Sequence, residues 1–149
     1  MIPALADHPR ELHPDRTAAQ VGGTFVKVNV TSPEDNERMY KVAVDTYGSI
    51  DVAFHNAGIS PPDDDSIETT ELPAWQRVQD VNLKSVYLCC RSALRYMVKQ
   101  GRGSIINTAS IAGLQAGFGP LAYSTAKCAV IHMSRCAAAE LSPQKIRVN

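Results

Sequence analysis

Short β-branched runs alternate with longer helical segments along most of this chain of 149 residues, and this alternation limits the folds it can adopt. Two strands separated by a helix pair in parallel, because a parallel pair needs a long crossover between its strands. The pattern therefore predicts an α/β fold, a parallel sheet with helices on both faces and three layers in all. The expected strands are 24–30, 51–55, 104–108 and 146–149, and the expected helices are 33–47, 73–100 and 122–141.

Capping and breaking residues predict where several of these elements begin and end. Ser32 stands at an N-cap position before Pro33, which suits a first helical turn, and Gly48 stops the same helix. Residues 60–71 are rich in proline and aspartate and residues 113–120 are rich in glycine. Both segments are therefore expected to be loops.

The beginning of the chain is expected to differ from the rest. Residues 1–15 contain three prolines and no hydrophobic period, which predicts irregular structure. Residues 16–21 are expected to be the tail of a helix that a pair of glycines ends. We therefore divide the chain into an irregular N-terminal segment, residues 1–20, and one domain, residues 21–149.

Composition excludes several functional classes. Fifteen Lys and Arg residues balance fifteen Asp and Glu residues, so the net charge is zero and no basic stripe predicts binding to nucleic acid or to an anionic membrane. No apolar run is long enough to cross a bilayer, and Met1–Gln20 lacks the apolar centre of a signal peptide. The sequence thus predicts a cytoplasmic protein that binds neither nucleic acid nor membrane.

The cysteines and histidines predict neither a disulfide nor a metal site. The cysteine spacing resembles neither a disulfide framework nor a zinc site, which favours reduced thiols buried as small apolar groups. His8, His13 and His132 have no ligand-like spacing with cysteines or acids, so no metal is expected. The cysteines are Cys89, Cys90, Cys128 and Cys136.

Tyr123 and Lys127 carry the clearest chemistry in the sequence. They lie four residues apart on an expected helix, so their side chains share one face about 6 Å apart. An ammonium about 4 Å from a phenol favours the phenolate by roughly 4 kcal/mol at an effective dielectric near 20. Alone, the two residues would be a surface pair on an amphipathic helix. Ser110, which follows an expected strand, adds a hydroxyl, and the three groups together suit proton transfer at a carbonyl-level oxygen.

Five segments together resemble the short-chain dehydrogenases/reductases, and most closely the bacterial 3-oxoacyl-acyl-carrier-protein reductases. The resemblance extends from about Val21 to Asn149. It implies a partial Rossmann-like, doubly wound parallel sheet and an NAD(P)-dependent oxidoreductase that moves a hydride between nicotinamide and a carbonyl or secondary alcohol. The segments are FHNAGIS (54–60), QDVNLKS (79–85), IINTASIAG (105–113), AYSTAKCAV (122–130) and IRVN (146–149).

The resemblance implies a catalytic role for four residues. Tyr123 is the acid or base, Lys127 also holds the nicotinamide ribose hydroxyls, and Ser110 hydrogen-bonds the substrate oxygen. The backbone carbonyl of Asn82 is implied to hold a water that links Lys127 to solvent. The alternatives from the residues alone are that Ser110 is a turn or cap serine and that Asn82 is an exposed helical asparagine.

The resemblance also implies a site for NAD or NADP. Asn56, Ala57 and Gly58 occupy the turn at which the family's backbone approaches the adenosine side of the cofactor, and Gly58 has no side chain to obstruct it. Asn29 stands where the family commonly has an Asp that contacts adenine. The alternative is an ordinary asparagine at the end of a strand. His55 replaces the first residue of the family's usual pair of asparagines.

The sequence lacks the Gly-rich turn, Thr-Gly-x-x-x-Gly-x-Gly, with which the family opens. In the strand order 3-2-1-4-5-6, the first two strands separate the third from the fourth. Their absence leaves the strand at 51–55 with an open edge, which favours aggregation or pairing with another chain. The resemblance therefore implies a fragment, without the residue that selects NAD or NADP.

Two functions remain open at this point. The chain is an enzyme of this family acting on a small carbonyl or alcohol substrate, or it is an inactive remnant that serves at most as an association module. In the family, the helices that match 73–100 and 122–141 commonly form a contact between subunits. The resemblance thus implies a homo-oligomer in either case, and we expect little or no turnover by this chain alone.

Overall fold

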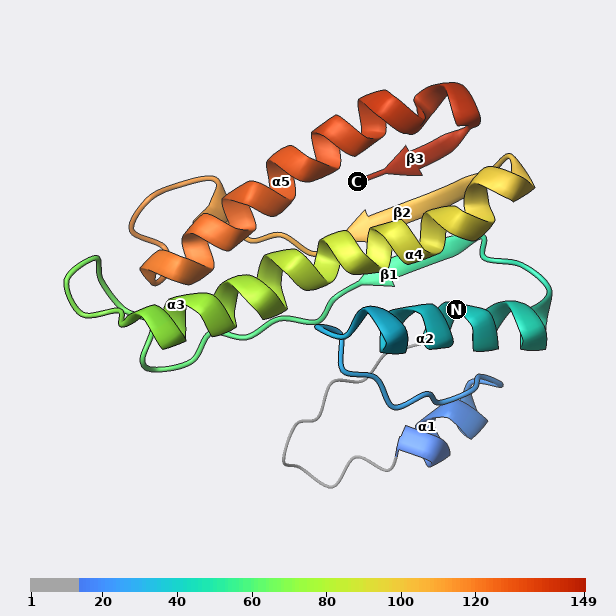
Figure 1. Ribbon diagram of the computed structural model, residues 1–149, viewed down its shortest axis with the longest axis horizontal. Helices are drawn as coiled ribbons and strands as arrows, with labels where there is room; N and C mark the ends of the chain where they lie inside the picture. The colour runs from blue at the N-terminus through green and yellow to red at the C-terminus, as the bar shows by residue number, and fades with distance from the viewer. Residues whose placement is uncertain (1–13) are drawn as a thin grey trace.

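A computed structural model describes residues 14–149 of this protein (Figure 1). Within these residues, three parallel strands form one sheet. β1 (Val52–His55) pairs with β2 (Gly103–Asn107), and β2 pairs with β3 (Ile146–Val148), all in parallel. The strands follow one another across the sheet in chain order. The predicted α/β class is therefore confirmed, and three of the four predicted strands form within one residue of their expected bounds.

The three predicted helices are confirmed, with one irregularity. A π-helical segment, η1 (Asp80–Lys84), interrupts the regular α-helix of the second one, and the sequence did not predict it. The α-helices are α1 (Pro14–Gln20), α2 (Pro33–Tyr47), α3 (Leu72–Gln79), α4 (Ser85–Gln100) and α5 (Leu121–Leu141), and the 3-10 turns are η2 (Ile111–Gly113) and η3 (Ser142–Gln144).

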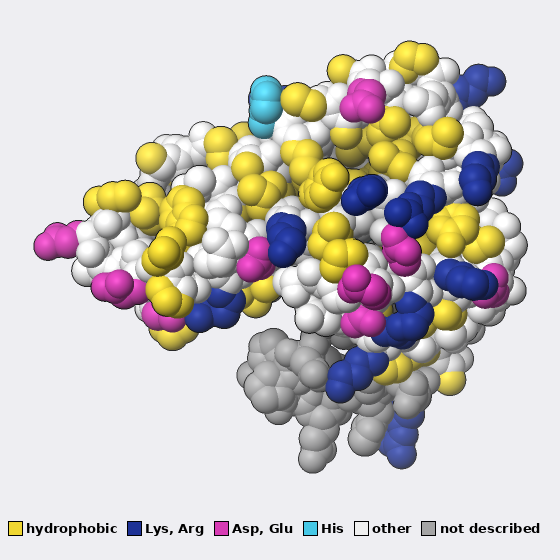
Figure 2. Space-filling model, viewed as in Figure 1, with side chains coloured by type: hydrophobic (Ala, Val, Ile, Leu, Met, Phe, Trp, Pro, Cys, Tyr) yellow, Lys and Arg dark blue, Asp and Glu magenta, His cyan; other side chains and the backbone are white. Residues whose placement is uncertain are grey.

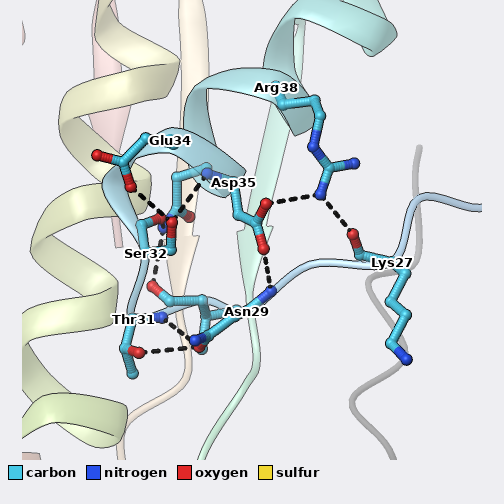
Figure 3. Close-up of polar contacts among 9 residues, drawn as sticks. Lys27, Asn29, Thr31, Ser32, Glu34, Asp35 and Arg38 are labelled. Atoms are coloured by element: carbon cyan, nitrogen blue, oxygen red, sulfur yellow. Dashed lines mark hydrogen bonds and ion pairs between the residues drawn. The ribbon is translucent and has the colours of Figure 1, made fainter.

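The start of α2 shows how local sequence fixes an element (Figure 3). The Ser32 hydroxyl oxygen accepts a hydrogen bond from the Asp35 N–H at 3.2 Å, as the predicted N-cap requires. Asp35 accepts from the N–H of Asn29 at 2.8 Å and pairs with Arg38 at 2.7 Å. At the other end, Gly48 ends the helix with φ 82°, a conformation that a side chain would strain. Both predicted ends of this helix are therefore confirmed.

Helices cover only one face of the sheet within the described residues. α2, α4 and α5 pack into a single core against that face. Both crossovers move to the next strand in the same direction, and right-handed connections then place α3–α4 and α5 on the same side, where α2 also packs. The expected third layer is therefore not seen over residues 14–149, where the opposite face exposes Val52 (45%), Phe54 (53%) and Ile106 (39%). The covered face carries Ala53, His55, Ile105, Ile146 and Val148.

The strand predicted at 24–30 is wrong, because this segment has no regular secondary structure. Arg38 donates to the Lys27 carbonyl oxygen at 2.7 Å and Asn36 donates to that of Val30 at 2.8 Å. Side chains of α2 thus satisfy backbone groups that a sheet would otherwise pair. A β-branched run forms a strand only where another strand can pair with it, and within the described residues none lies beside this one.

A groove of about 410 Å³ lies beside the free edge of β1. Its lining is mainly apolar and comes from α2, α4 and β1, with Val30 from the segment 24–30. The predicted open edge is confirmed over residues 14–149, where β1 is the terminal strand of the sheet.

The described end of the N-terminal segment is helical. The sequence predicts irregular structure for residues 1–15 and the tail of a helix for residues 16–21, and α1 confirms the helix. Gly22 has φ 66°, and the N–H of Gly23 bonds the carbonyl oxygen of Ala18 at 2.7 Å, so the predicted glycine stop is confirmed. The rest of the prediction, for residues 1–13, lies outside the described residues.

The prediction of buried thiols holds for two cysteines and is wrong for the other two. Cys89 and Cys90 are buried in α4, whereas Cys128 and Cys136 are exposed on α5. The last two lie eight residues apart, which places them on one face of α5 that points away from the core.

The surface in Figure 2 mixes basic, acidic and apolar side chains. Among the helices that the structure describes, none combines the length and the apolarity that crossing a membrane demands.

Candidate functional site

The carboxyl ends of β1 and β2 lie at the same edge of the sheet, because the strands are parallel and His55 stands opposite Asn107. Thr108, which follows β2, hydrogen-bonds to the residues at the carboxyl end of β1. Its N–H donates to the His55 carbonyl oxygen at 3.0 Å, and its hydroxyl donates to the Asn56 side-chain oxygen at 3.0 Å. Open α/β sheets bind ligands outside the carboxyl ends of their strands, which makes this edge the place to look for a site.

Lys127 lies at this edge with its side chain buried. The residue is 3% exposed, and Nζ donates to the Thr108 carbonyl oxygen at 2.7 Å. Nζ also lies 5.7 Å from the ring centroid of Tyr123, one turn earlier on α5. Burial lowers the pKa of Lys127 below its usual 10.5. The alternative of an exposed surface pair is therefore excluded.

The Lys127 ammonium has donors left for a ligand. An ammonium donates up to three hydrogen bonds, and over residues 14–149 its only acceptor is the Thr108 carbonyl oxygen. A buried cation with unused donors suits a ligand with several oxygens, such as the diol of a ribose. The residues at this point thus fit the nicotinamide ribose of a dinucleotide.

Ser110 directly precedes η2, which packs on α5. Its Oγ accepts from the Ala112 N–H at 3.2 Å, so it caps η2, as one alternative predicted. That contact uses the oxygen as an acceptor and leaves the hydroxyl proton for another group. η2 packs directly on α5, because a Cβ added to Gly113 would lie 2.6 Å from the carbonyl carbon of Lys127. The capping role and a substrate-binding role are therefore compatible.

Asn82 is fully buried, which excludes the alternative of an exposed helical asparagine. Its side-chain oxygen accepts from the Ile59 N–H at 3.0 Å, and its nitrogen donates to the Ile59 carbonyl oxygen at 2.8 Å. A Cβ added to Gly58 would lie 2.8 Å from Asn82 Oδ1 and 3.6 Å from Lys127 Nζ. Asn82 therefore fixes the turn after β1 beside the lysine, from a π segment of a kind often found at functional sites.

The predicted cofactor residues fall in two places. Asn56 and Ala57 contribute to the lining of the groove beside β1, next to Gly58. Asn29 lies in the turn before α2, where its side-chain oxygen accepts from the N–H of Thr31 at 3.1 Å and from its hydroxyl at 2.8 Å (Figure 3). No strand ends there, so the alternative of a strand-end asparagine is wrong.

His55 belongs to a buried chain of polar groups rather than to the open turn. Its Nδ1 lies 2.8 Å from Asn107 Oδ1 and its Nε2 lies 2.7 Å from Tyr40 Oη. An amide oxygen only accepts, so Nδ1 carries the proton and Nε2 accepts from the tyrosine. Burial lowers the pKa of His55 from 6.5 to about 4, which keeps the ring neutral. The described residues contain no group of three or more His, Cys, Asp or Glu that could hold a metal ion.

Asp64 is a candidate functional residue that the sequence did not predict, because its segment was expected to be a plain loop. This residue is 4% exposed, and its two side-chain oxygens accept from the N–H groups of Ala122 and Tyr123 at 2.9 and 2.8 Å. Three consecutive aspartates, residues 63–65, were the available signal, but nothing in the sequence tells which of them is buried.

Comparison with known proteins places this chain in a family. A family model described as enoyl-(acyl carrier protein) reductase matches residues 3–149. A crystal structure of a short-chain type dehydrogenase/reductase from Mycobacterium marinum aligns with a TM-score of 0.81 and 38% identity, covering 88% of this chain and 54% of that one. The chain belongs to the short-chain dehydrogenase/reductase family. Membership confirms the resemblance and the Rossmann-like fold.

Curated relatives within the short-chain dehydrogenase/reductase family have varied names. (+)-Borneol dehydrogenase 2 from Salvia officinalis is 37% identical over 138 residues, which are 90% of this chain and 49% of that protein. The 3-oxoacyl-[acyl-carrier-protein] reductase from Synechocystis is 36% identical over 83% of this chain and 49% of its own length. 3beta-Hydroxysteroid dehydrogenase 2 from Eggerthella lenta is 40% identical over 83% and 48%. The chain thus spans about half the length of the curated relatives it matches.

Proposed function

We propose that this chain carries the catalytic half of an NAD(P)-dependent oxidoreductase, with Tyr123 as the acid or base. The observation that carries the proposal is the buried Lys127 ammonium, 5.7 Å from the Tyr123 ring centroid and bonded to the Thr108 carbonyl oxygen. An ammonium held beside a phenol is a pair that suits proton transfer to or from a carbonyl-level oxygen.

Four residues share the work at the reacting oxygen. Tyr123 gives its proton to the oxygen during reduction and takes it back during oxidation. Ser110 donates its remaining hydroxyl proton to the same oxygen and stabilises developing negative charge. Lys127 holds the phenol in its reactive state, and the backbone carbonyl of Asn82 orients a water that returns protons to Lys127.

The chain's own residues fit parts of both halves of a dinucleotide. Lys127 and Tyr123 would hold the nicotinamide ribose, Asn56, Ala57 and Gly58 would border the adenosine side, and Asn29 would lie toward the adenine. The bound nicotinamide supplies or accepts the hydride, and a carbonyl or secondary alcohol is the reaction partner. The proposal places the chain in the cytoplasm, where its four unpaired cysteines stay reduced.

A second candidate is an association module without turnover. The open edge of β1 and the exposed face that carries Val52 and Phe54 favour it, because such surfaces pair with other polypeptides. Contact between like subunits through α3–α4 and α5 belongs to both candidates. We expect little or no turnover by the 149-residue chain, since it lacks a Gly-rich phosphate-binding turn.

Titration of the purified chain with NADH, and separately with NADPH, tests the proposal. Binding is followed as energy transfer from Trp75, the single tryptophan, to the reduced nicotinamide. We expect saturable binding that the variant Lys127→Met lacks. A folded chain that binds neither dinucleotide would favour the association module, and turnover assays with Tyr123→Phe follow if binding is found.

A further inference from the structure

α5 begins without a capping side chain of its own. Pro120 occupies the N-cap position and has no side-chain acceptor. The first bond within the helix runs from the Ser124 N–H to the Pro120 carbonyl oxygen at 2.9 Å. The N–H groups of the three residues between them therefore need acceptors from elsewhere in the protein.

The loop after β1 supplies all three acceptors. Asp64 Oδ1 accepts from the Ala122 N–H at 2.9 Å, and Oδ2 accepts from the Tyr123 N–H at 2.8 Å. The carbonyl oxygen of Asp65 accepts from the Leu121 N–H at 3.0 Å. A buried carboxylate is stable here because two N–H groups and the positive end of a helix compensate its charge.

The neighbouring aspartates do different work. Asp63 is exposed and pairs with Arg77 at 2.6 Å on the surface, and the exposed Asp65 contacts α5 only through its backbone. Asp64 alone places a carboxylate under the first turn of α5. That turn carries Tyr123, whereas Lys127, one turn later, is held separately by Thr108.

We propose that Asp64 is a positioning residue, which fixes the first turn of α5 and thereby sets the Tyr123 phenol against the Lys127 ammonium. The catalytic importance of the Tyr123 position rests on the proposed function, but the fixing of that position by Asp64 does not. Without the carboxylate the first turn loses two of its three outside acceptors and frays. The phenol then moves while the ammonium stays on Thr108, so the distance between them is no longer fixed.

Asp64→Asn in the full 149-residue chain is the first test. The amide keeps one oxygen and presents an NH₂ group where the other N–H needs an acceptor. By NMR, we expect amide exchange at Ala122 and Tyr123 to become at least about tenfold faster, with exchange at Lys127 unchanged, since a frayed turn opens locally. The Tyr123 ring resonance, assigned with Tyr123→Phe, should shift as well. Asp63→Asn is the matched control, with the same loss of charge one residue away.

A rescue experiment separates positioning from general stabilisation. Pro120 has φ −65° and ψ 164°, an N-cap conformation, so Pro120→Ser offers a local acceptor to the N–H groups of Ala122 and Tyr123. In the Asp64→Asn background it should restore both the slow exchange and the Tyr123 ring resonance. If Asp64→Asn alone does not fold, recovery of folding in the double variant supports the proposal in the same way.

Three outcomes would overturn the positioning role. Asp64→Asn could match Asp63→Asn in exchange and in the Tyr123 ring resonance, it could speed exchange equally at every amide, or Pro120→Ser could restore nothing. None of these readouts needs a dinucleotide. A chain in which Asp64→Asn loosens only the first turn, while the wild type binds neither NADH nor NADPH, would keep the positioning role and lose the proposed function.

Discussion

Lys127 Nζ lies 2.7 Å from the carbonyl oxygen of Thr108, the residue directly after β2. With the 2.9 Å bond from the Asn107 side chain to Ser134 Oγ, this bond ties α5 to the carboxyl edge of the sheet, and it holds a cation inside the protein at 3% exposure. Burying an ammonium costs free energy that one hydrogen bond offsets only in part. The placement of Lys127 is therefore expected to favour function over stability.

Lys127→Met should make the chain more stable and unable to bind a dinucleotide. We expect the free energy of unfolding at pH 7 to rise by about 1 kcal/mol, a usual gain when a costly functional group is removed. Because burial lowers the pKa of Lys127, the wild type gains stability as pH rises through that pKa toward 10.5, and the variant does not. Urea unfolding at pH 7 and above pH 9 measures both effects. A less stable variant would show that the bond to Thr108 outweighs the cost of burial.

His55 should make the fold sensitive to mild acid. Its pKa is 6.5 when free and about 4 in the fold, so the unfolded chain binds the proton more readily between these values. Stability is therefore complete above about pH 6.5 and falls toward pH 4, by roughly 3 kcal/mol in all. Asp35, Asp51 and Asp63 have pKa values lowered below 3.8 and titrate outside this window.

The variant His55→Asn checks this assignment. The thermal midpoint of the wild type should fall between pH 7 and pH 5, and that of the variant should change much less. An equal fall in both proteins would assign the acid sensitivity to other groups.

Gly113→Ala should separate η2 from α5. The added Cβ would lie 2.6 Å from the carbonyl carbon of Lys127 and 2.7 Å from the nitrogen of Cys128, and these backbone atoms cannot rotate away. We expect a loss of about 3 kcal/mol in the free energy of unfolding, at the upper end for overpacking. Gly117→Ala is the comparison, because its cost comes from φ 84° alone with nothing within 4 Å, about 1 kcal/mol. Equal losses in urea unfolding would mean that η2 moves freely.

Two matched variants should show which surface the chain uses to associate with itself. Phe54 is 53% exposed on the uncovered face of the sheet, and Tyr87 is 51% exposed on α4. If the open sheet drives association, Phe54→Lys lowers the sedimentation-derived mass at high concentration and Tyr87→Lys does not. The reverse result is expected if the contact runs through the helices. We expect Phe54→Lys to have the larger effect, because it lies next to an unpaired strand edge.

Thiol labelling should distinguish two unreactive buried cysteines from two reactive exposed ones. Burial raises the pKa of Cys89 to about 12 and that of Cys90 to about 11, so neither forms a thiolate near neutral pH. Cys128 and Cys136 are exposed and should react with a thiol reagent in the folded chain. Mass spectrometry after brief labelling should find two modified residues, and labelling of Cys89 in the native state would contradict the packing of α4.

The sequence predicted most elements because their signals are local. Ser32 and Gly48 mark the ends of α2 whatever surrounds them, and Tyr123 and Lys127 share a face of any helix that contains them. The failures are non-local. The segment 24–30 has the composition of a strand, but no described strand lies beside it to pair with. Asp64 differs from Asp63 and Asp65 in that its carboxylate lies against the first turn of α5. Burial of a loop residue depends on a helix that begins more than fifty residues later in the chain.

The π segment gives the long helix an ability that a regular one lacks. Positions four apart drift by about 40° per step in an α-helix, so four such steps turn a side chain by roughly 160°. α3 packs on α5 and α4 packs on the sheet. Even so, one series of residues spaced by four stays buried along the whole length from α3 to α4. η1 resets the phase of the helix between its two halves. Apart from the buried Asn82, the segment should consequently tolerate many changes of residue but no change of length, because one deletion would rotate everything after it by about 100°. The buried series is Ala74, Val78, Asn82, Val86 and Cys90.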